Sequence, residues 1–211
     1  MDSTDWLEWH TPYEDETSEL SGRLRSVQRG IRAHLDARPD GPIRVVSACA
    51  GQGRDLIEVL ATHPARDRVT ARLVELDPRN VAVARAAATA NGLTSVEVIE
   101  GDAAAIDTYA DAVPADLVLF CGVFGNIVPA DVERTVRALP QLCTPGATVI
   151  WTRGRHDPDI RDTIRAWFTD TGFEELSFDA PGNVEWSVGI NRLTTAPHPI
   201  EPGLRLFTFT H

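Results

Sequence analysis

Residues 44–60 decide the fold, and they read Arg44-Val45-Val46-Ser47-Ala48-Cys49-Ala50-Gly51-Gln52-Gly53-Arg54-Asp55-Leu56-Ile57-Glu58-Val59-Leu60. The stretch begins as a short apolar strand, passes through a turn of small residues and continues as a helix. Gly51 and Gly53 let the backbone of the turn approach a bound molecule closely, and the first N–H groups of the helix point toward that molecule. The sequence therefore predicts a cofactor-binding turn between a buried strand and a helix.

The spacing of the glycines bears on which cofactor the turn would bind. A dinucleotide site needs G-x-G-x-x-G, and counting from Gly51 and Gly53 the third glycine falls on Leu56. This replacement disfavours an NAD-dependent oxidoreductase, which stays as the less favoured alternative. A plain strand-to-helix turn without a ligand is the structural alternative.

A second strand, predicted over Val69 to Leu76, ends in Glu75-Leu76-Asp77-Pro78. In an open α/β sheet, an acid about 20 residues beyond the glycines lies at the carboxyl end of the adjacent strand, where it accepts hydrogen bonds from both ribose hydroxyls. Glu75 is predicted for this role, and an exposed strand-end carboxylate is the alternative. Asp77 is predicted to cap the helix that begins at Pro78.

A third strand, predicted over residues 96–99, is followed by Glu100-Gly101-Asp102-Ala103. The glycine turn, the E-L-D-P and the G-D-A occur in an order that resembles the cofactor-binding half of class I S-adenosylmethionine (SAM) methyltransferases. The resemblance covers residues 43–152. Within the D/E-x-G-x-G-x-G turn of that family, Ser47 replaces the usual acid and Cys49 the first glycine.

The resemblance implies a role for each position that matches. The backbone of the turn faces the methionine part of SAM, Glu75 binds the ribose, and Leu76 packs on the adenine. Asp102 accepts the adenine amino hydrogens and Ala103 supplies a backbone N–H to a ring nitrogen. The loop after the fourth strand lies beneath the transferable methyl. The implied cofactor-binding set is Cys49, Ala50, Gly51, Gly53, Glu75, Leu76, Asp102, Ala103 and Cys121.

The substrate side is predicted from the loop after the fourth strand and from the segment after the fifth. Asn126 lies in the first, Arg153 and His156 in the second, and Tyr13 in an N-terminal arm. The loop lacks [DN]-P-P-[YF], which disfavours methylation of a base amino group. A general base is needed only if the acceptor is protonated; His10, Tyr13 and His156 are the candidates, with packing or surface exposure as the alternative for each.

The arm itself, residues 1–16, carries Trp6, Trp9, His10 and Tyr13 among acidic residues. Aromatic residues in such an arm either close over the occupied site as a lid or fix the arm to the body as a brace. Both interpretations stay open at this point.

Length and composition indicate the number of domains and the kind of protein. The 211 residues, 43% hydrophobic and 24% charged, suit a single domain with a full core. We divide it into an arm and cap helix (1–38), a cofactor-binding half (43–152) and a substrate-side half (153–211). No apolar run approaches the length of a membrane span and no leader opens the chain, so we expect a cytoplasmic protein. The oligomeric state is not predicted.

Residue usage excludes several kinds of site. The chain has no lysine, which excludes a P-loop lysine and a pyridoxal-phosphate Schiff base. Its three cysteines and six histidines lack paired spacing, so neither a disulfide framework nor a metal site is expected. A net charge of −11 repels phosphate backbones, which disfavours nucleic acid as substrate.

The predicted fold is α/β: a three-layer, doubly wound and mostly parallel sheet with an N-terminal helical cap. The resemblance implies seven strands in the order 3-2-1-4-5-7-6 with one antiparallel strand. Closing strands are predicted at residues 173–178 and 204–210, with 186–193 as an additional strand or hairpin. The predicted function is methyl transfer from SAM to a small molecule, with S-adenosylhomocysteine (SAH) as product; a SAM-binding protein without catalysis is the alternative.

Overall fold

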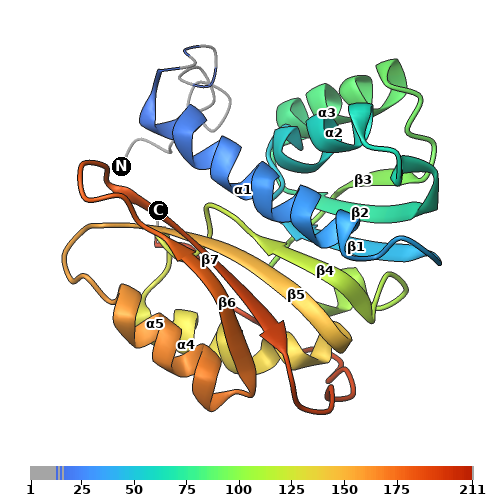
Figure 1. The fold of residues 1–211 in the computed structure, drawn as a ribbon. Coiled ribbons are helices and arrows are strands. Elements are labelled where there is room, and N and C mark those ends of the chain that lie inside the picture. The colour runs from blue at the N-terminus through green and yellow to red at the C-terminus, as the bar shows by residue number, and fades with distance from the viewer. Residues whose placement is uncertain (1–12, 14, 16, 211) are drawn as a thin grey trace.

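A seven-stranded sheet with helices on both faces forms the core of the fold (Figure 1). The computed structural model describes residues 13, 15 and 17–210. The strand order is β3-β2-β1-β4-β5-β7-β6, which confirms the predicted order. All neighbouring strands pair in parallel except β7, which is antiparallel to both β5 and β6. The strands are β1 Ile43–Ala48, β2 Val69–Glu75, β3 Val96–Glu100, β4 Ala115–Phe120, β5 Cys143–Gly154, β6 Phe173–Asp179 and β7 Trp186–Leu193.

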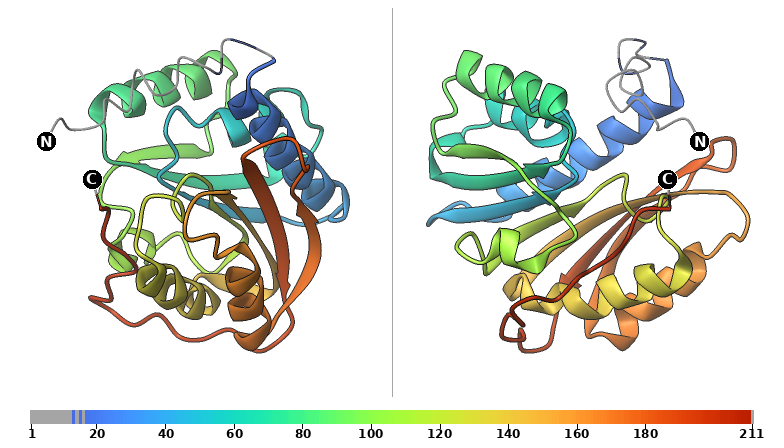
Figure 2. Two further views of the ribbon diagram at one scale, coloured as in Figure 1. Left: turned by 90° about the vertical axis from the view of Figure 1, so that its left-hand side faces the viewer. Right: turned by 180° about the vertical axis from the view of Figure 1, so that it is seen from behind.

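Helices cover both faces of the sheet, as the turned views show (Figure 2). The first face carries α1 (Glu19–Asp36), α2 (Arg54–Thr62) and α3 (Pro78–Ala90). The second carries α4 (Pro129–Ala138) and α5 (Arg161–Asp170). Short 3-10 turns at Arg66–Arg68, Ile106–Tyr109 and Leu139–Gln141 complete the connections.

The central strands β1 and β4 are mostly apolar and buried because both of their faces are covered. Val45 of β1 and Leu117 of β4 are buried against α1, α2 and α3, whereas the adjacent Val46 and Val118 are buried on the side of α4 and α5. Successive side chains therefore feed two separate cores. The resulting sheet holds the carboxyl ends of β1 to β5 along one edge, where a site can form.

Side-chain caps start two of the helices. The Ser18 hydroxyl accepts a hydrogen bond from the Ser21 N–H at 3.1 Å and starts α1. Asp77 accepts from the Arg79 N–H at 2.9 Å, which confirms it as the cap of α3.

The closing strand predicted at residues 204–210 is wrong. This segment, here called the C-terminal strap (residues 203–210), forms only isolated bridges, one between Ala105 and Arg205 and one between Ile127 and Phe209. Most of its backbone hydrogen bonds go to loops and to side chains of α4 instead of a neighbouring strand; the Thr135 hydroxyl, for example, donates to the Leu206 carbonyl at 2.9 Å. Residues 186–193, left open between strand and hairpin, form β7, which pairs with β6 on one side and β5 on the other.

Among the residues that the structure describes, no helix has both the length and the apolar content that crossing a membrane requires.

Candidate active site

The glycine turn after β1 folds tightly against the end of β2. Cys49, Gly51 and Gly53 have φ values of +52°, +55° and +70°, all in the left-handed region. A Cβ at Gly53 would lie 2.7 Å from Ile57 Cδ1 and 2.8 Å from Leu73 Cδ2, so both backbone conformation and space require glycine there. Cys49 adopts the left-handed conformation despite its side chain.

Glu75, at the carboxyl end of β2, joins this turn to the start of α3. Its carboxylate is buried, with 8% of the residue exposed. Oε2 accepts a hydrogen bond from the Gly51 N–H at 2.8 Å, and Oε1 accepts from the Asp77 N–H at 2.9 Å. Each oxygen keeps a lone pair for a further donor. The next side chain, Leu76, is 65% exposed and offers an apolar surface beside the carboxylate.

Asp102, after β3, is held by two donors. Its Oδ1 accepts from the Ala104 N–H at 2.9 Å, and its Oδ2 accepts from Arg205 Nη1 of the C-terminal strap at 2.8 Å. Burial raises the pKa of this carboxyl, but the Ala104 and Arg205 hydrogen bonds outweigh it and the pKa lies below its usual value. Asp102 is therefore ionised at neutral pH. Arg205 was not predicted, because the partner lies at the far end of the chain.

Cys49 lies close enough to both carboxylates for their charges to act on its thiol. Burial raises the pKa of its thiol, and the charges of Glu75 and Asp102 raise it further. The neighbouring Ala103 is buried, and its carbonyl accepts a hydrogen bond from the buried Tyr109 hydroxyl at 2.9 Å. The structure thus brings together the turn and the two acids that the sequence singled out.

A second group of polar residues lies around Cys121, at the end of β4. Burial raises the pKa of the Cys121 thiol, and Asp55 raises it further. Arg23 Nη2 of α1 donates to the Tyr13 hydroxyl at 2.9 Å, and the Arg54 guanidinium lies 5.5 Å from the centre of the Tyr13 ring. Asp55 was not predicted as a site residue. Asp55 had a sequence signal, since it follows Gly53 by two residues in the first turn of α2.

The loop after β4 is held by its own polar groups. The Gly122 N–H donates to the Thr152 hydroxyl of β5 at 2.8 Å, and the Asn126 amide donates to the Gly122 carbonyl at 2.7 Å. The Thr210 N–H of the strap donates to the Asn126 carbonyl at 3.1 Å. Asn126 therefore shapes the loop.

Arg153, near the end of β5, joins this loop to the next one. It is 5% exposed, and its guanidinium donates to the Phe124 carbonyl and, at 3.2 Å, to the Pro158 carbonyl. Its Nε is buried without a partner among the described residues. Burial lowers the pKa of Arg153.

His156 is exposed, and its ring lies over Gly125 and Gly154. Its Nδ1 is 3.0 Å from where a Cβ of Gly154 would be. Partial burial lowers the pKa of the imidazole, and the Arg153 charge lowers it further. The ring is therefore neutral at neutral pH and able to accept a proton.

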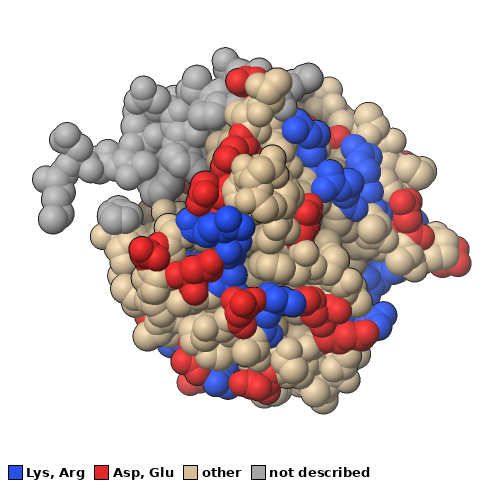
Figure 3. All heavy atoms as spheres, turned by 60° about the vertical axis from the view of Figure 1, so that its left-hand side comes forward, with Lys and Arg blue, Asp and Glu red and all other residues tan. Residues whose placement is uncertain are grey.

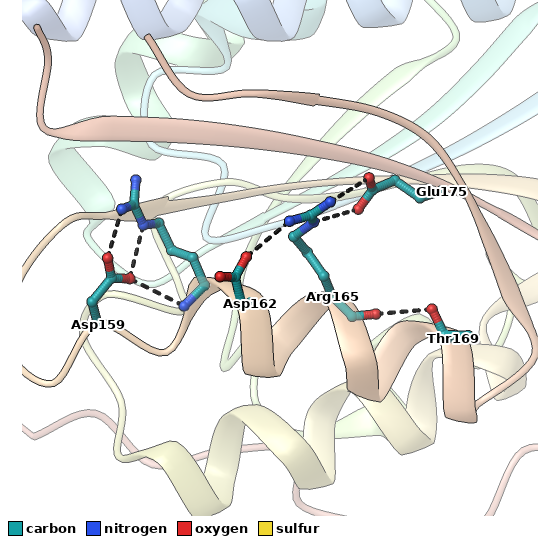
Figure 4. A network of polar contacts seen from close by, with 6 residues as sticks. Asp159, Asp162, Arg165, Thr169 and Glu175 are labelled. Carbon is teal, nitrogen blue, oxygen red and sulfur yellow. Dashed lines mark hydrogen bonds and ion pairs between the residues drawn. The ribbon is translucent and has the colours of Figure 1, made fainter. Parts of the chain in front are cut away.

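The outer wall of this side is built from ion pairs between the β5–α5 loop, α5 and β6 (Figure 4). Arg161 donates to both oxygens of Asp159, at 2.8 and 2.6 Å, and keeps the pKa of that carboxyl at about 2. Arg165 of α5 bonds both oxygens of Glu175 on β6, at 2.7 and 3.0 Å, and reaches Asp162 at 2.8 Å. The Asp159 pair links the loop after His156 to the start of α5, and the Glu175 pair links α5 to β6.

Acidic and basic residues are interspersed on the face that Figure 3 shows, with no broad patch of one sign. Of the arginines on α1, Arg29 pairs with Asp179 at 3.1 Å. Within residues 13, 15 and 17–210, no group of three or more His, Cys, Asp or Glu side chains is arranged to hold a metal ion. His10, Trp6 and Trp9, predicted in the arm, lie outside the described residues.

In a comparison with protein families, residues 45–146 match the methyltransferase domain. The comparison with curated proteins gives no match.

Solved structures of methyltransferases share the fold. Magnesium protoporphyrin IX methyltransferase from Synechocystis, crystallised with bound SAM, has a TM-score of 0.67 at 16% identity, covering 91% of this chain and 92% of that one. An O-methyltransferase family protein from Burkholderia thailandensis has a TM-score of 0.62 at 17% identity, covering 82% of this chain and 57% of that one. An rRNA methylase from Streptococcus thermophilus has a TM-score of 0.59 at 13% identity, covering 78% and 94%.

The family match covers the segment that carries the glycine turn, Glu75, Asp102 and Cys121, and the strand order of the whole sheet is that of the methyltransferase fold. Residues 45–146 thus match the methyltransferase domain, and the fold of the chain is one that solved SAM-dependent methyltransferases share.

Proposed function

We propose that this enzyme transfers the methyl group of SAM to a small-molecule acceptor by in-line displacement at the sulfonium methyl. The observation that carries the proposal is the grouping of Glu75 and Asp102 beside the glycine turn, with a separate polar group around Cys121. The nucleoside part of the cofactor fits beside Glu75 and Asp102, and its reacting end fits beside Cys121. Catalysis then consists mainly of alignment, since holding nucleophile, methyl carbon and sulfur in line removes much of the entropic barrier.

In this proposal Glu75 binds the ribose hydroxyls with the lone pairs that Gly51 and Asp77 leave open. Asp102 accepts the adenine amino hydrogens, Leu76 packs on the ring, and Ala103 donates to a ring nitrogen. The methionine end runs along the backbone from Cys49 to Gly53 toward Cys121. The proposal treats residues 1–38, 43–152 and 153–211 as parts of one domain.

The acceptor is proposed to lie beyond Cys121, bordered by Tyr13, the Asn126 loop, Arg153 and His156. A small molecule is favoured over nucleic acid by the net charge of −11 and by the ion pairing of surface arginines. His156 is the candidate base, because its imidazole is exposed and neutral at neutral pH. A cytoplasmic location is part of the proposal, since free thiols such as those of the cysteines are usual in a reducing compartment.

Calorimetry with SAM, SAH and NADH tests the cofactor, and turnover of methyl-labelled SAM on a panel of small acceptors and on RNA tests the acceptor class. We expect binding of SAM and SAH, no binding of NADH, and label in a small acceptor alone. Label in RNA would overturn the small-molecule proposal. Tight SAM binding with no turnover on any acceptor would favour a binding protein, and NADH binding an oxidoreductase.

A further inference from the structure

The charged residues near the glycine turn fall into two sets that face different parts of the site. Glu75 and Asp102 act on the thiol of Cys49, whereas Asp55 and Arg23 act on that of Cys121. The first set is the one proposed for the nucleoside. The second set has no role in that assignment and contains one carboxylate and one guanidinium.

Asp55 has a half-buried carboxylate of which only one oxygen accepts a hydrogen bond within the described part of the chain. Its Oδ1 accepts from the Leu56 N–H at 2.8 Å. Its Oδ2 has no hydrogen-bond partner among the residues that the structure describes. Burial raises the pKa of Asp55 to about 6 even though the Leu56 hydrogen bond acts the other way. A carboxylate in such a place is stabilised by a cation that reaches its free oxygen.

The arginines near Asp55 do not form an ion pair with it, and the Arg23 charge lowers the pKa of Asp55 by less than burial raises it. Arg23 donates to the Tyr13 hydroxyl at 2.9 Å, and Arg54 Nε pairs with Glu58 at 3.0 Å while its guanidinium lies over the Tyr13 ring. Within the described part of the chain, neither arginine approaches the Asp55 carboxylate within 4.0 Å. The free oxygen is thus open to a ligand.

The methionine end of SAM carries the charge that this place requires. Its amino acid is a zwitterion, and the α-ammonium end is a cation that can reach the open oxygen of Asp55. Ser47, which stands where the family has an acid, is buried and neutral and supplies no charge. Asp55 lies on the neighbouring helix, two residues beyond Gly53.

We propose that Asp55 binds the α-ammonium group of the cofactor's methionine moiety and so takes over the task of the acid missing at Ser47. This inference rests on the proposed function. The ion pair fixes the amino-acid end of SAM, and because that end is joined to the sulfur, it also fixes the direction of the methyl toward Cys121. Asp55 is in this sense a cofactor-positioning residue.

Titration of Asp55 gives the inference a distinct pH signature. The groups that face it are Arg23 of α1, Tyr13 ahead of α1, Cys121 after β4 and Glu58 of α2. Tyr13 and Cys121 have pKa values raised by burial and stay neutral below pH 8. Protonation of Asp55 below pH of about 6 removes its charge, so affinity for an ammonium ligand falls there and reaches its full value above that pH.

The test is calorimetry on the full chain with SAH and with its analogue that lacks the α-amino group. At pH 7.5, Asp55→Asn should weaken SAH binding by about tenfold or more and leave the desamino analogue unchanged. Glu58→Gln removes the same charge one turn along the same helix, and it should change neither affinity by more than about twofold.

A pH series on the wild-type protein decides the question without any variant, in case Asp55→Asn does not fold. SAH affinity should fall from pH 7 to pH 5, while the desamino analogue binds equally well throughout. Equal pH profiles for the two ligands, or equal losses for both in Asp55→Asn, would overturn the role of Asp55 and leave the proposed function standing. A wild-type protein that does not bind SAH at all would overturn the proposed function, and the inference with it.

Discussion

Replacing Glu75 with alanine should destabilise the free protein before any ligand is considered. The substitution removes the acceptor of two backbone N–H groups, those of Gly51 and Asp77, at 2.8 and 2.9 Å. A buried donor left without a partner costs about 1–3 kcal/mol; the Gly51 N–H is such a donor and the part-buried Asp77 N–H adds less, so the two together cost about 2–4 kcal/mol. Domains of this size have about 5–15 kcal/mol of stability in total. The loss is therefore large, and it changes how a binding experiment on this variant must be interpreted.

Chemical denaturation and thermal melting without ligand measure this effect. For a chain of about 200 residues, each kcal/mol shifts the melting midpoint by about 2–4 °C, so we expect Glu75→Ala to melt at least about 4 °C lower. Glu174→Ala is the matched control, because Glu174 forms a half-exposed ion pair with Arg192 at 2.8 Å that is worth less than about 1 kcal/mol. Equal midpoints for the two variants would refute the bridging role of Glu75.

The ribose role needs a milder change. Glu75→Gln keeps the volume of the side chain and one oxygen that can accept a hydrogen bond. Its NH2 group, however, is placed against one of the two backbone N–H groups, and two donors cannot bond to each other. We expect a smaller loss of stability than with alanine and a loss of SAH affinity of about tenfold or more, since charge-assisted hydrogen bonds to the ribose weaken. If the Glu75→Gln variant is less stable than wild type but binds SAH as tightly, Glu75 has the structural role and the ribose role is refuted.

Three further predictions concern other parts of the molecule. Asp102→Ala should weaken SAH binding by about tenfold in calorimetry but spare an analogue without the adenine amino group; equal losses would make Asp102 structural. Gly53→Ala should destabilise more than Gly41→Ala in chemical denaturation, because both have positive φ but only the former methyl meets side chains below 3.0 Å; equal losses would exclude the clash. Removing residues 1–16 should spare the fold and reduce turnover, and the arm should resist protease only when cofactor is bound; equal protection with and without ligand would make it a brace.

Much of the fold was predictable because its signals are local. The caps at Ser18 and Asp77 and the two-sided apolar runs of β1 and β4 each lie within a few residues of the element they define. The error at residues 204–210 has a physical cause of the same kind. Phe207 is buried and Thr208 is exposed, as in a strand. Alternation of apolar and polar residues shows which side chains face the core, but it does not show which segment the backbone pairs with.

The site was predictable where sequence distance fixes position in the sheet. Glu75 lies at the end of β2 because the glycine turn and the following helix have a standard length. Arg205 and Arg23 have no such relation to the residues that they approach, since one comes from the C-terminal strap and the other from the helix ahead of β1. Contacts of this kind are set by tertiary packing, which no local pattern reports.

The two departures of the glycine turn from the family pattern differ in kind, and neither argues against catalysis. Cys49 keeps the left-handed φ of a glycine, at +52°, so its side chain costs about 1–2 kcal/mol of backbone strain but leaves the path of the turn intact. Ser47 removes a charge, which local geometry cannot replace. A charge can be supplied from another element, and with the proposed role of Asp55 it comes from the first turn of α2. With the charge supplied by Asp55, the altered turn still fixes the orientation of the methyl donor. A methyltransferase requires a fixed orientation, whereas a protein that only binds SAM does not.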